Sequence, residues 1–327
     1  MLKFSTTVAR TLPFALLMAV GSPGIAQQTY PNRAIRFIVP YPPGGSTDPM
    51  ARLAAGRLAE RWGQSVVVDN RPGGNTIIGT EAVAKAAPDG YTILLASSAL
   101  LTAPSLFPRL PYDALKDFTG VATIARSRFV LVLGPSVPAN TLQEFIALAK
   151  SRPGQLNFAT SGVGANTHLS AELFNGMVGT KMNHIPYKGS GLLVTDLISG
   201  RVELSFQVPI TVMTHVTSGR LKAIAITGDN RAPALPEVPT FSEAGLPGFR
   251  AEGWFGIVAP AATPKNAINK MSREMAVILA MPDPRDYLIK QGSEAFISTP
   301  EQVTALIKAD VAKYAKIIKD ANIKVEH

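Results

Sequence analysis

The chain has 327 residues, 46% of them hydrophobic, with 27 Gly, 26 Pro, no Cys and a formal net charge of +9. This length exceeds what one compact core usually holds, so two domains of roughly 100–200 residues are expected in a globular, turn-rich protein. Lys and Arg are scattered and form no basic run interleaved with aromatic residues, which argues against nucleic acid as a partner, and the lack of Cys excludes disulfides and a lipid-modified N-terminal cysteine.

The first 26 residues have the three parts of a secretory signal peptide. A charged start is followed by the apolar segment 11–20 and by small residues that end at Gly24-Ile25-Ala26. The apolar segment is too short to span a bilayer permanently, so we expect cleavage after Ala26. The mature chain is therefore expected to begin near Gln27 and to diffuse in a bacterial periplasm.

The first strand, loop and helix of the mature chain form a junction suited to an anion. Residues 35–39 predict a strand, residues 40–47 a glycine turn, and residues 48–62 a helix, with Asp48 as the N-cap. Glycines let a ligand approach the backbone, and a helix start offers unpaired N–H groups with partial positive charge. We expect residues 44–47 to face a carboxylate, although many such turns use Gly and Asp only to change direction.

A second and a third strand follow, and each is bounded by turn residues. Residues 65–69 and 91–96 predict strands, and residues 76–87 predict a helix between them. Strands that alternate with helices indicate a mostly parallel sheet covered on both faces, and the ligands of such sheets bind outside the carboxyl ends of the strands.

Two long apolar segments predict strands that cross between two domains. Residues 119–133 are expected to cross into the second domain, and residues 254–260 to return. We therefore assign residues 27–125 and 252–327 to domain 1 and residues 126–251 to domain 2, with a cleft and a hinge between them.

Domain 2 is expected to repeat the architecture of domain 1, and its remaining elements follow from turn and capping signals. Residues 228–248 are expected to form a surface connection. The predicted elements are a helix from Thr141 with a capping box to Glu144, strands 156–160, 182–185, 202–207 and 221–227, helices from about Asn166 and from Ser190 to Ser199, and C-terminal helices 264–280 and 300–320.

Residues 161–168, Ser-Gly-Val-Gly-Ala-Asn-Thr-His, repeat the logic of the first junction. They lack the third glycine of a dinucleotide fingerprint, and Ser161 is not in a Gly-x-Ser-x-Gly elbow. The four His show no metal-ligand spacing, so no cofactor or metal is expected, and His168 is expected to lie behind the ligand rather than act as a base. Two such junctions facing each other would surround a carboxylate with hydroxyls and N–H groups.

Motifs over nearly the whole mature chain resemble one family. They are Tyr30-Pro31, Pro43-Gly44-Gly45 with Asp48, Asn70-Arg71-Pro72-Gly73, Pro88-Asp89-Gly90-Tyr91-Thr92, Ser161-Gly162-x-Gly164 with His168, Pro186-Tyr187-Lys188-Gly189, Asp196-Leu197 with Gly200, Leu235-Pro236-Glu237-Val238-Pro239-Thr240 and Glu243-Ala244-Gly245. In order and number these motifs resemble the tripartite tricarboxylate transporter receptors, also called the Bug (Bordetella uptake gene) periplasmic solute-binding proteins.

The resemblance implies a type II periplasmic-binding-protein fold, an α/β architecture of two interwoven domains that closes like a Venus flytrap around a small carboxylated solute. It further implies delivery of that solute to the permease subunits of a membrane transporter by a monomeric receptor that is not an enzyme. Glu203 stands where the family usually has Asp, and Gln207 takes the cleft-facing position. The expected ligand-binding residues are Tyr41, Gly44, Gly45, Ser46, Thr47, Asn75, Ser161, Gly162, Val163, Gly164, Ala165, Asn166, Tyr187 and Gln207, with Asp48 and His168 behind them.

Two alternatives stay open at this point. The closed protein could dock on a signalling partner instead of a permease, or it could be an enzyme that acts on a carboxylate. The second is disfavoured because no acid/base pair with plausible spacing is present. The sequence leaves open which carboxylate is bound.

Overall fold

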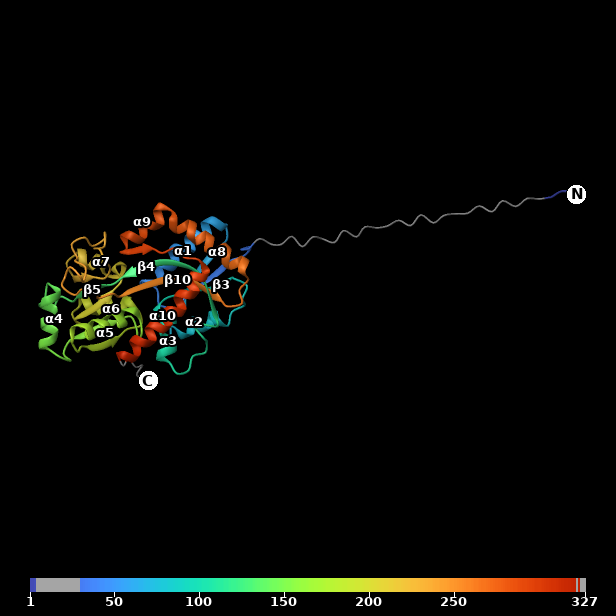
Figure 1. The fold of residues 1–327 in the computed structure, drawn as a ribbon. Coiled ribbons are helices and arrows are strands. Elements are labelled where there is room, and N and C mark those ends of the chain that lie inside the picture. The colour runs from blue at the N-terminus through green and yellow to red at the C-terminus, as the bar shows by residue number, and fades with distance from the viewer. Residues whose placement is uncertain (4–29, 322, 324–327) are drawn as a thin grey trace.

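The computed structural model describes residues 1–3, 30–321 and 323, and it has two lobes, each built on its own β-sheet (Figure 1). The first lobe carries a six-stranded sheet and the second a five-stranded sheet. Most of the predicted signal peptide, with its cleavage site at Ala26, lies outside the described residues.

The sheet of the first lobe has the strand order β11-β4-β10-β3-β1-β2. Strands β2, β1 and β3 are parallel, whereas β10 runs antiparallel to both β3 and β4. The expectation of a mostly parallel sheet is therefore wrong, because the returning strand enters the centre of the sheet from the opposite direction. The strands are β1 (Ile35–Val39), β2 (Val66–Asn70), β3 (Thr92–Ala96), β4 (Phe118–Arg128), β10 (Glu252–Pro260) and β11 (Ser293–Ala295).

Alternating side chains of this sheet pack against helices on its two faces. Phe37 and Val39 of β1 join the core formed with α1 and α8, and Ile38 joins the core formed with α3 and α10. The helices are α1 (Thr47–Trp62), α2 (Ile77–Ala84), α3 (Ser98–Leu106), α8 (Lys265–Ala280), α9 (Pro282–Lys290) and α10 (Pro300–Asp320). Because both faces of the sheet are covered and β1 and β3 are parallel, the carboxyl ends of these two strands lie together at one edge of the sheet.

The second lobe has the strand order β7-β6-β8-β5-β9, again with parallel and antiparallel pairs. The core of this lobe contains five phenylalanines whose rings contact one another: Phe145, Phe174, Phe206, Phe241 and Phe249. Its strands are β5 (Val130–Leu133), β6 (Asn157–Thr160), β7 (Asn183–Pro186), β8 (Leu204–Gln207) and β9 (Lys222–Ile226), and its helices are α4 (Leu142–Ser151), α5 (Asn166–Val178), α6 (Ser190–Ile198) and α7 (Pro209–Thr217).

The strands β4 and β10 run side by side between the lobes (Figure 1). The predicted strand 119–133 is in fact two strands, because β4 ends at Arg128 and β5 begins at Val130 in the other sheet. Phe129 leaves the first ladder, donates its N–H to the Thr227 hydroxyl (2.8 Å) and accepts from the Thr227 N–H (2.8 Å). The chain thus changes sheets at one residue.

Capping differs from the prediction at two helices, α1 and α4. Asp48 lies inside the first turn of α1 rather than at its N-cap, and its carboxylate accepts hydrogen bonds from Arg52 and Asn70. At α4 the Thr141 hydroxyl caps the Glu144 N–H as predicted, but the Glu144 carboxylate accepts from the Asn140 N–H, so the box is not reciprocal. The reciprocal box occurs at α10, between Thr299 and Gln302.

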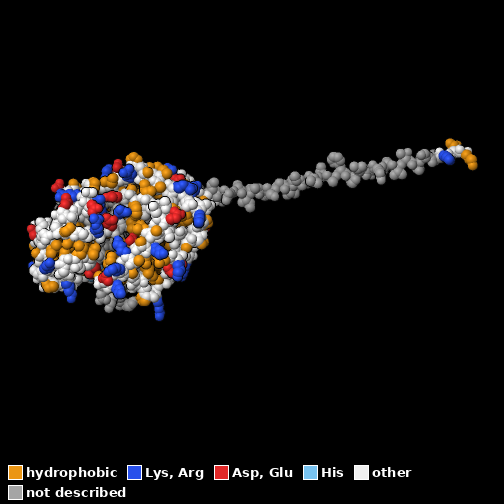
Figure 2. All heavy atoms as spheres, viewed as in Figure 1, with side chains coloured by type: hydrophobic (Ala, Val, Ile, Leu, Met, Phe, Trp, Pro, Cys, Tyr) orange, Lys and Arg blue, Asp and Glu red, His pale blue; other side chains and the backbone are white. Residues whose placement is uncertain are grey.

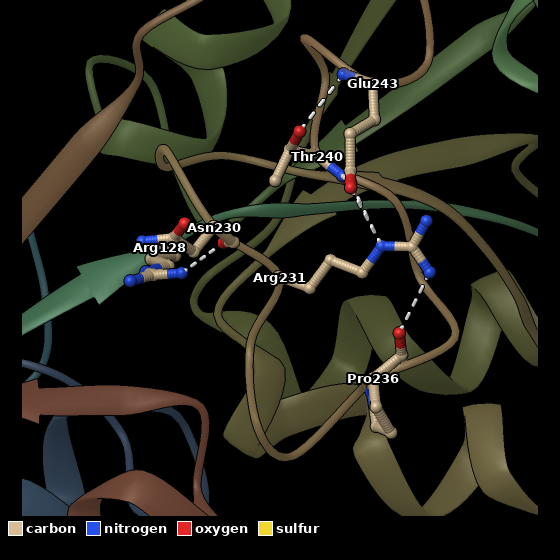
Figure 3. Close-up of polar contacts among 6 residues, drawn as sticks. All are labelled: Arg128, Asn230, Arg231, Pro236, Thr240 and Glu243. Atoms are coloured by element: carbon tan, nitrogen blue, oxygen red, sulfur yellow. Dashed lines mark hydrogen bonds and ion pairs between the residues drawn. The ribbon is translucent and has the colours of Figure 1, made fainter.

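The connection 228–248 is only partly a surface loop, which corrects the prediction. Phe241 is 1% exposed and stacks on Phe206. Figure 3 shows how its polar residues are held: Arg231 donates to the Glu243 carboxylate (3.0 Å) and to the Pro236 carbonyl (3.1 Å). The same connection lies beside the crossing, because Arg128 donates to the Asn230 carbonyl (2.5 Å).

Candidate functional site

A cavity of about 480 Å³ lies between the two lobes, at the carboxyl ends of β1 and β3 in the first and of β6, β7 and β8 in the second. Residues of both lobes and of both crossing strands line it. The lining residues are Tyr41, Pro42, Pro43, Gly45, Ser46, Thr47, Ser97, Ser98, Ser127, Phe129, Ser161, Ala165, Asn166, Thr167, Lys188, Gly189, Ser190, Gly191, Leu192, Val208, Gly253 and Phe255. The volume lies within the range of small-molecule sites.

Five helices begin at the wall of this cavity. They are α1, α3, α5, α6 and α7, and none of the five has a side-chain hydrogen bond at its N-cap. Among the described helices that begin elsewhere, α4 and α10 are capped by Thr141 and Thr299, whereas α2, α8 and α9 also have no side-chain cap hydrogen bond, so the common feature of the five is their position at the cavity. A helix start carries unpaired N–H groups and about half a positive charge. The cavity is therefore a region of positive potential built from backbone.

The first loop, residues 40–47, is held in place by hydrogen bonds on the side away from the cavity. The Asp48 carboxylate accepts from the Asn70 amide (3.0 Å), and the same amide donates to the Tyr41 carbonyl (3.1 Å). The Tyr41 hydroxyl lies 3.2 Å from the Ser97 hydroxyl, and burial raises the pKa of Tyr41, so its phenol stays protonated. Asp48 thus supports the loop without lining the cavity.

The second loop is organised by Thr167, whose hydroxyl accepts from the Ser161 N–H (3.0 Å) and lies 3.1 Å from the Ser161 hydroxyl. Behind the loop, His168 accepts from the Gly164 N–H at Nδ1 (3.1 Å) and is 3% exposed. His168 stacks on His184 with ring centroids 3.8 Å apart, and His184 Nε2 lies 2.6 Å from the Thr160 hydroxyl. Burial, with the neighbouring His168, lowers the pKa of His184 to about 3, so His184 is neutral.

Hydrogen bonds join the two lobes around the cavity. The Asn75 amide donates to the Val163 carbonyl (2.9 Å). The Asn166 N–H donates to the Ser98 hydroxyl (3.0 Å), and the Asn166 amide oxygen accepts from the Tyr314 hydroxyl of α10 (3.1 Å). These bonds connect groups on opposite lobes, so the structure represents a closed arrangement.

Close packing reinforces this contact. Gly164 has φ +73°, and a Cβ at this position would lie 2.1 Å from Leu106 Cδ1 and 2.9 Å from the Thr102 hydroxyl, both of α3 in the first lobe. Gly253 on β10 also allows close packing, since a Cβ there would lie 2.3 Å from the side-chain nitrogen of Asn166, which would have to move. Glycine at these positions lets the loop of one lobe approach the other lobe closely.

The structure brings about half of the expected binding residues to the cavity wall. Those that line it are Tyr41, Gly45, Ser46, Thr47, Ser161, Ala165 and Asn166, and those that do not are Gly44, Asn75, Gly162, Val163, Gly164, Tyr187 and Gln207. Asn75, Val163 and Gly164 instead form the contact between the lobes.

Tyr187 and Gln207 have other partners. The Tyr187 hydroxyl donates to Asp196 (2.8 Å), and burial, with this carboxylate, raises the pKa of Tyr187 to about 12. Gln207 is fully buried; its amide nitrogen donates to Ser205 (2.7 Å) and its oxygen accepts from Thr211 (3.2 Å). We therefore leave both out of the proposed binding residues.

Sequence reasoning missed three parts of the wall. Ser97 and Ser98 follow the end of β3, so the rule that ligands bind beyond strand ends, applied to the third strand, would have found them. Residues 188–192 also line the cavity; they connect β7 to the start of α6, as the first two loops connect their strands to α1 and α5. Phe129 and Phe255 on the crossing strands carry no local signal, because only the topology brings them together.

Within the described residues there is no group of three or more His, Cys, Asp or Glu side chains that could hold a metal ion. In that same part of the chain no helix is both long and apolar enough to cross a membrane. Figure 2 shows acidic and basic side chains interspersed over the face in view.

Comparison with known proteins agrees with this geometry. Residues 50–323 match the family described as tripartite tricarboxylate transporter family receptor. Protein BugT of Bordetella pertussis is 40% identical over 304 residues, which cover 92% of this chain and 93% of BugT.

Two solved structures are similar over about nine-tenths of the chain. Rpa4515 of R. palustris, solved with adipate, has a TM-score of 0.87 and 34% identity, covering 90% of this chain and 99% of that one. The periplasmic binding protein BugD has a TM-score of 0.84 and 32% identity, covering 91% and 100%.

The type II periplasmic-binding-protein fold, with two interwoven α/β lobes and a ligand cavity between them, is thus confirmed. The family consists of solute-binding receptors and not of enzymes. The chain belongs to the tripartite tricarboxylate transporter receptors of the Bug type.

Proposed function

We propose that this protein is an exported receptor that closes around a small carboxylated solute and delivers it to the permease subunits of a tripartite transporter. The observation that carries the proposal is the convergence of five uncapped helix starts on one cavity. Several hydrogen bonds to a charged group, each worth roughly 1.5–3 kcal/mol, can hold a carboxylate without an Arg. Adipate, with which Rpa4515 was solved, is a small carboxylate.

The proposed ligand-binding residues are those of the expected set that line the cavity, namely Tyr41, Gly45, Ser46, Thr47, Ser161, Ala165 and Asn166, with Ser97 and Ser98 added. Asp48 and His168 support them from behind. The proposal includes removal of the signal peptide near Ala26, release into the periplasm and a monomeric state. It also keeps the division into two domains, with the first boundary moved from residues 125–126 to Phe129, where the chain changes sheets, and the second at residues 251–252.

A thermal-shift screen of the purified mature protein against a library of mono-, di- and tricarboxylates tests the proposal. We expect at least one carboxylate to raise the melting temperature in a concentration-dependent way, because a ligand that binds only the folded state stabilises it by mass action. Failure of the whole library would reject the carboxylate receptor. Product analysis of the same mixtures addresses the enzyme alternative, since turnover of a bound carboxylate would contradict a pure receptor.

The choice between a permease and a signalling partner needs a separate measurement. We expect a deletion of the gene to abolish uptake of the identified carboxylate into cells, and a plasmid copy to restore it. Normal uptake together with a lost transcriptional response to the carboxylate would favour the signalling alternative.

A further inference from the structure

The turn before α2, residues 73–76, has an unusual backbone. Its four residues, Gly-Gly-Asn-Thr, have φ angles of +129°, +54°, +50° and +76°. Asn75 and Thr76 are the two residues other than glycine with positive φ in the described part of the chain. Asparagine tolerates this region, whereas a β-branched residue there is an outlier, because its Cβ crowds the following carbonyl oxygen. Thr76 thus holds a conformation that its own side chain disfavours.

The Thr76 side chain does not compensate for this cost. It is 5% exposed, and its hydroxyl is buried with no hydrogen-bond partner among the described residues. Although Thr76 stands at the N-cap of α2, the hydroxyl does not cap the helix. The main chain is nevertheless fixed, since the Thr76 carbonyl accepts from the N–H (3.1 Å) and from the hydroxyl (2.9 Å) of Thr80. The helix α2 therefore holds the strained residue in place.

The same turn carries a residue that reaches the other lobe. The Asn75 amide nitrogen donates to the Val163 carbonyl of the second loop (2.9 Å). The amide oxygen lies near Gly162, where a Cβ would approach it to 3.0 Å. Ser161, next to Gly162, lines the ligand cavity, whereas Asn75 does not. Asn75 can therefore act on the ligand only through the backbone of the second loop.

Strain and contact occur side by side in this turn. A strained backbone persists only where the surrounding structure enforces it, and such residues cluster at ligand clamps and switch regions. Glycine would fit position 76 without the strain, but it would leave the turn more freedom to move. The bond from Asn75 to Val163 joins two lobes, so it exists only while the lobes are together. The strained residue thus supports a contact that belongs to the closed state.

We propose that Asn75 is a closure latch, a side chain that holds the two lobes together once they have met, and that Thr76 is the positioning residue that presents it. This inference rests on the proposed function. Because the latch forms after the ligand has entered, it slows release of the ligand and leaves association unchanged. Because Thr76 restricts the turn before closure, less conformational entropy is lost when the latch forms.

Stopped-flow fluorescence tests the latch, with adipate, the carboxylate with which Rpa4515 was solved, as the probe. Asn75→Gly keeps the left-handed backbone and removes the amide. We expect its dissociation rate to rise about three- to tenfold, as for the loss of one hydrogen bond, and its association rate to stay within twofold. Asn183→Ala is the matched control, because the Asn183 amide also donates to a backbone carbonyl, that of Gly154 (2.8 Å), but within the second lobe. Both rates should stay within twofold in the control.

The role of Thr76 is tested in Thr76→Gly and in the double variant with Asn75→Gly. Thr76→Gly relieves the left-handed strain, so the melting temperature of the free protein should not fall. Adipate should nevertheless dissociate about two- to fivefold faster, because the turn no longer holds Asn75 in place. The double variant should release adipate no faster than Asn75→Gly alone, since Thr76 acts through Asn75.

Three results would overturn the latch and leave the receptor function standing: unchanged dissociation in Asn75→Gly, an equal change in its association rate, or the same rise in Asn183→Ala. A lower melting temperature in Thr76→Gly, or effects that multiply in the double variant, would overturn the role of Thr76. If adipate does not bind, the rates are measured with the tightest carboxylate of the thermal-shift screen. A library without any binder rejects the receptor function and the latch together.

Discussion

Gly164 and Gly154 offer a matched test of closure at a single residue. Their φ angles are +73° and +72°, but a Cβ at Gly154 meets nothing within 4 Å, whereas at Gly164 it meets α3 of the opposite lobe. Both Ala variants should lose about 1–2 kcal/mol of stability from the left-handed backbone. Only Gly164→Ala should also weaken ligand binding, by about 1–3 kcal/mol of overpacking in the closed state.

Differential scanning calorimetry and calorimetric titration of the two glycine variants check this prediction. Equal ligand affinities in Gly164→Ala and Gly154→Ala would show that the contact between the second loop and α3 does not form in the bound state.

Ser161 and Thr47 test whether the two loops share one carboxylate. Both line the cavity, from opposite lobes. Ser161→Ala should weaken binding by about 1–3 kcal/mol, because a hydrogen bond to a charged group is lost. The double variant Thr47→Ala/Ser161→Ala should deviate from additivity by at least ~0.5 kcal/mol, as expected for groups with a common partner. Strictly additive affinities in titrations of the four proteins would mean that the loops act separately.

At the residue scale, the residues of the cavity wall could be predicted where turn residues mark the end of a strand and the start of a helix. The first two loops were visible because Gly, Ser and Thr stand between an apolar strand and a helix start, and residues 45–47 and Ser161 do line the cavity. The family resemblance placed Gln207 in the cleft as well. The structure instead turns its amide toward Ser205 and Thr211, which no spacing along the chain indicates.

The C-terminal helix α10 connects β10 of the first lobe with α5 of the second. Its Asp310 accepts from the Trp254 indole of β10 (2.8 Å), and its Tyr314 donates to Asn166 at the start of α5. Tyr314→Phe removes one hydrogen bond between the lobes, so ligand affinity should fall about two- to tenfold. In an Asn166→Ala background the same change should have no further effect, because the partner is already absent.

Tyr30→Phe is the control for Tyr314→Phe. The Tyr30 hydroxyl donates to the Gly90 carbonyl (2.8 Å) entirely within the first lobe. Its removal should lower stability without changing affinity in the same titrations. If Tyr30→Phe lost as much ligand affinity as Tyr314→Phe, the hydrogen bond between α10 and the second lobe would have no specific role in binding.

His184, which lies on β7 and stacks on His168 of α5, should make stability depend on pH. The pKa of His184 is lowered to about 3, against about 6.5 in the unfolded chain. Between these values the unfolded state binds more protons, so this contribution is complete above about pH 6.5 and is lost as the pH falls. The slope is at most about 1.4 kcal/mol per pH unit for one proton.

Urea unfolding of the parent and of His184→Gln at pH 7 and pH 5 measures the contribution of His184 to the pH dependence of the free energy of unfolding. His215, whose pKa burial also lowers, contributes with the same sign in both proteins and cancels in the comparison. The charged group nearest the pair is Glu172, 3.7 Å from His168 Nε2. An unchanged pH dependence in His184→Gln would mean that His184 is protonated in the folded state.

Element prediction succeeded for the long helix 300–320 and for the short helices α2 and α6, but it missed three other short helices, α3, α7 and α9. The helix 300–320 has a capping signal at Thr299 and an apolar stripe, and α10 has these bounds. The helix α3 was missed because it has nine residues, starts with serines and contains Pro104. The helices α7 and α9 also have nine residues each and begin at Pro, so their sequences resemble loops.

At the scale of the whole molecule, closure should be measurable. The lobes contact each other in the present structure, and β4 and β10 are the segments about which they can separate. We expect saturating adipate to lower the radius of gyration in small-angle X-ray scattering, and adipate at about 100 times its dissociation constant to add about 2.7 kcal/mol of stability. Tight binding without compaction would show that the free protein is already closed.

The position of β10 in the first sheet has a consequence for how the chain acquires its fold. This strand lies between β4 and β3, although about 120 residues of the second lobe separate it from β4 along the chain. A nascent chain that has emerged only as far as the second lobe holds β3 and β4 without the strand that joins them. The second lobe can fold while the first waits, and pairing over such sequence distances is slow because the loop-closure entropy comes first. A late central strand therefore delays the folding of the first lobe until residues 252–260 have been synthesised, so this lobe is still unfolded if the chain is exported while it is being made.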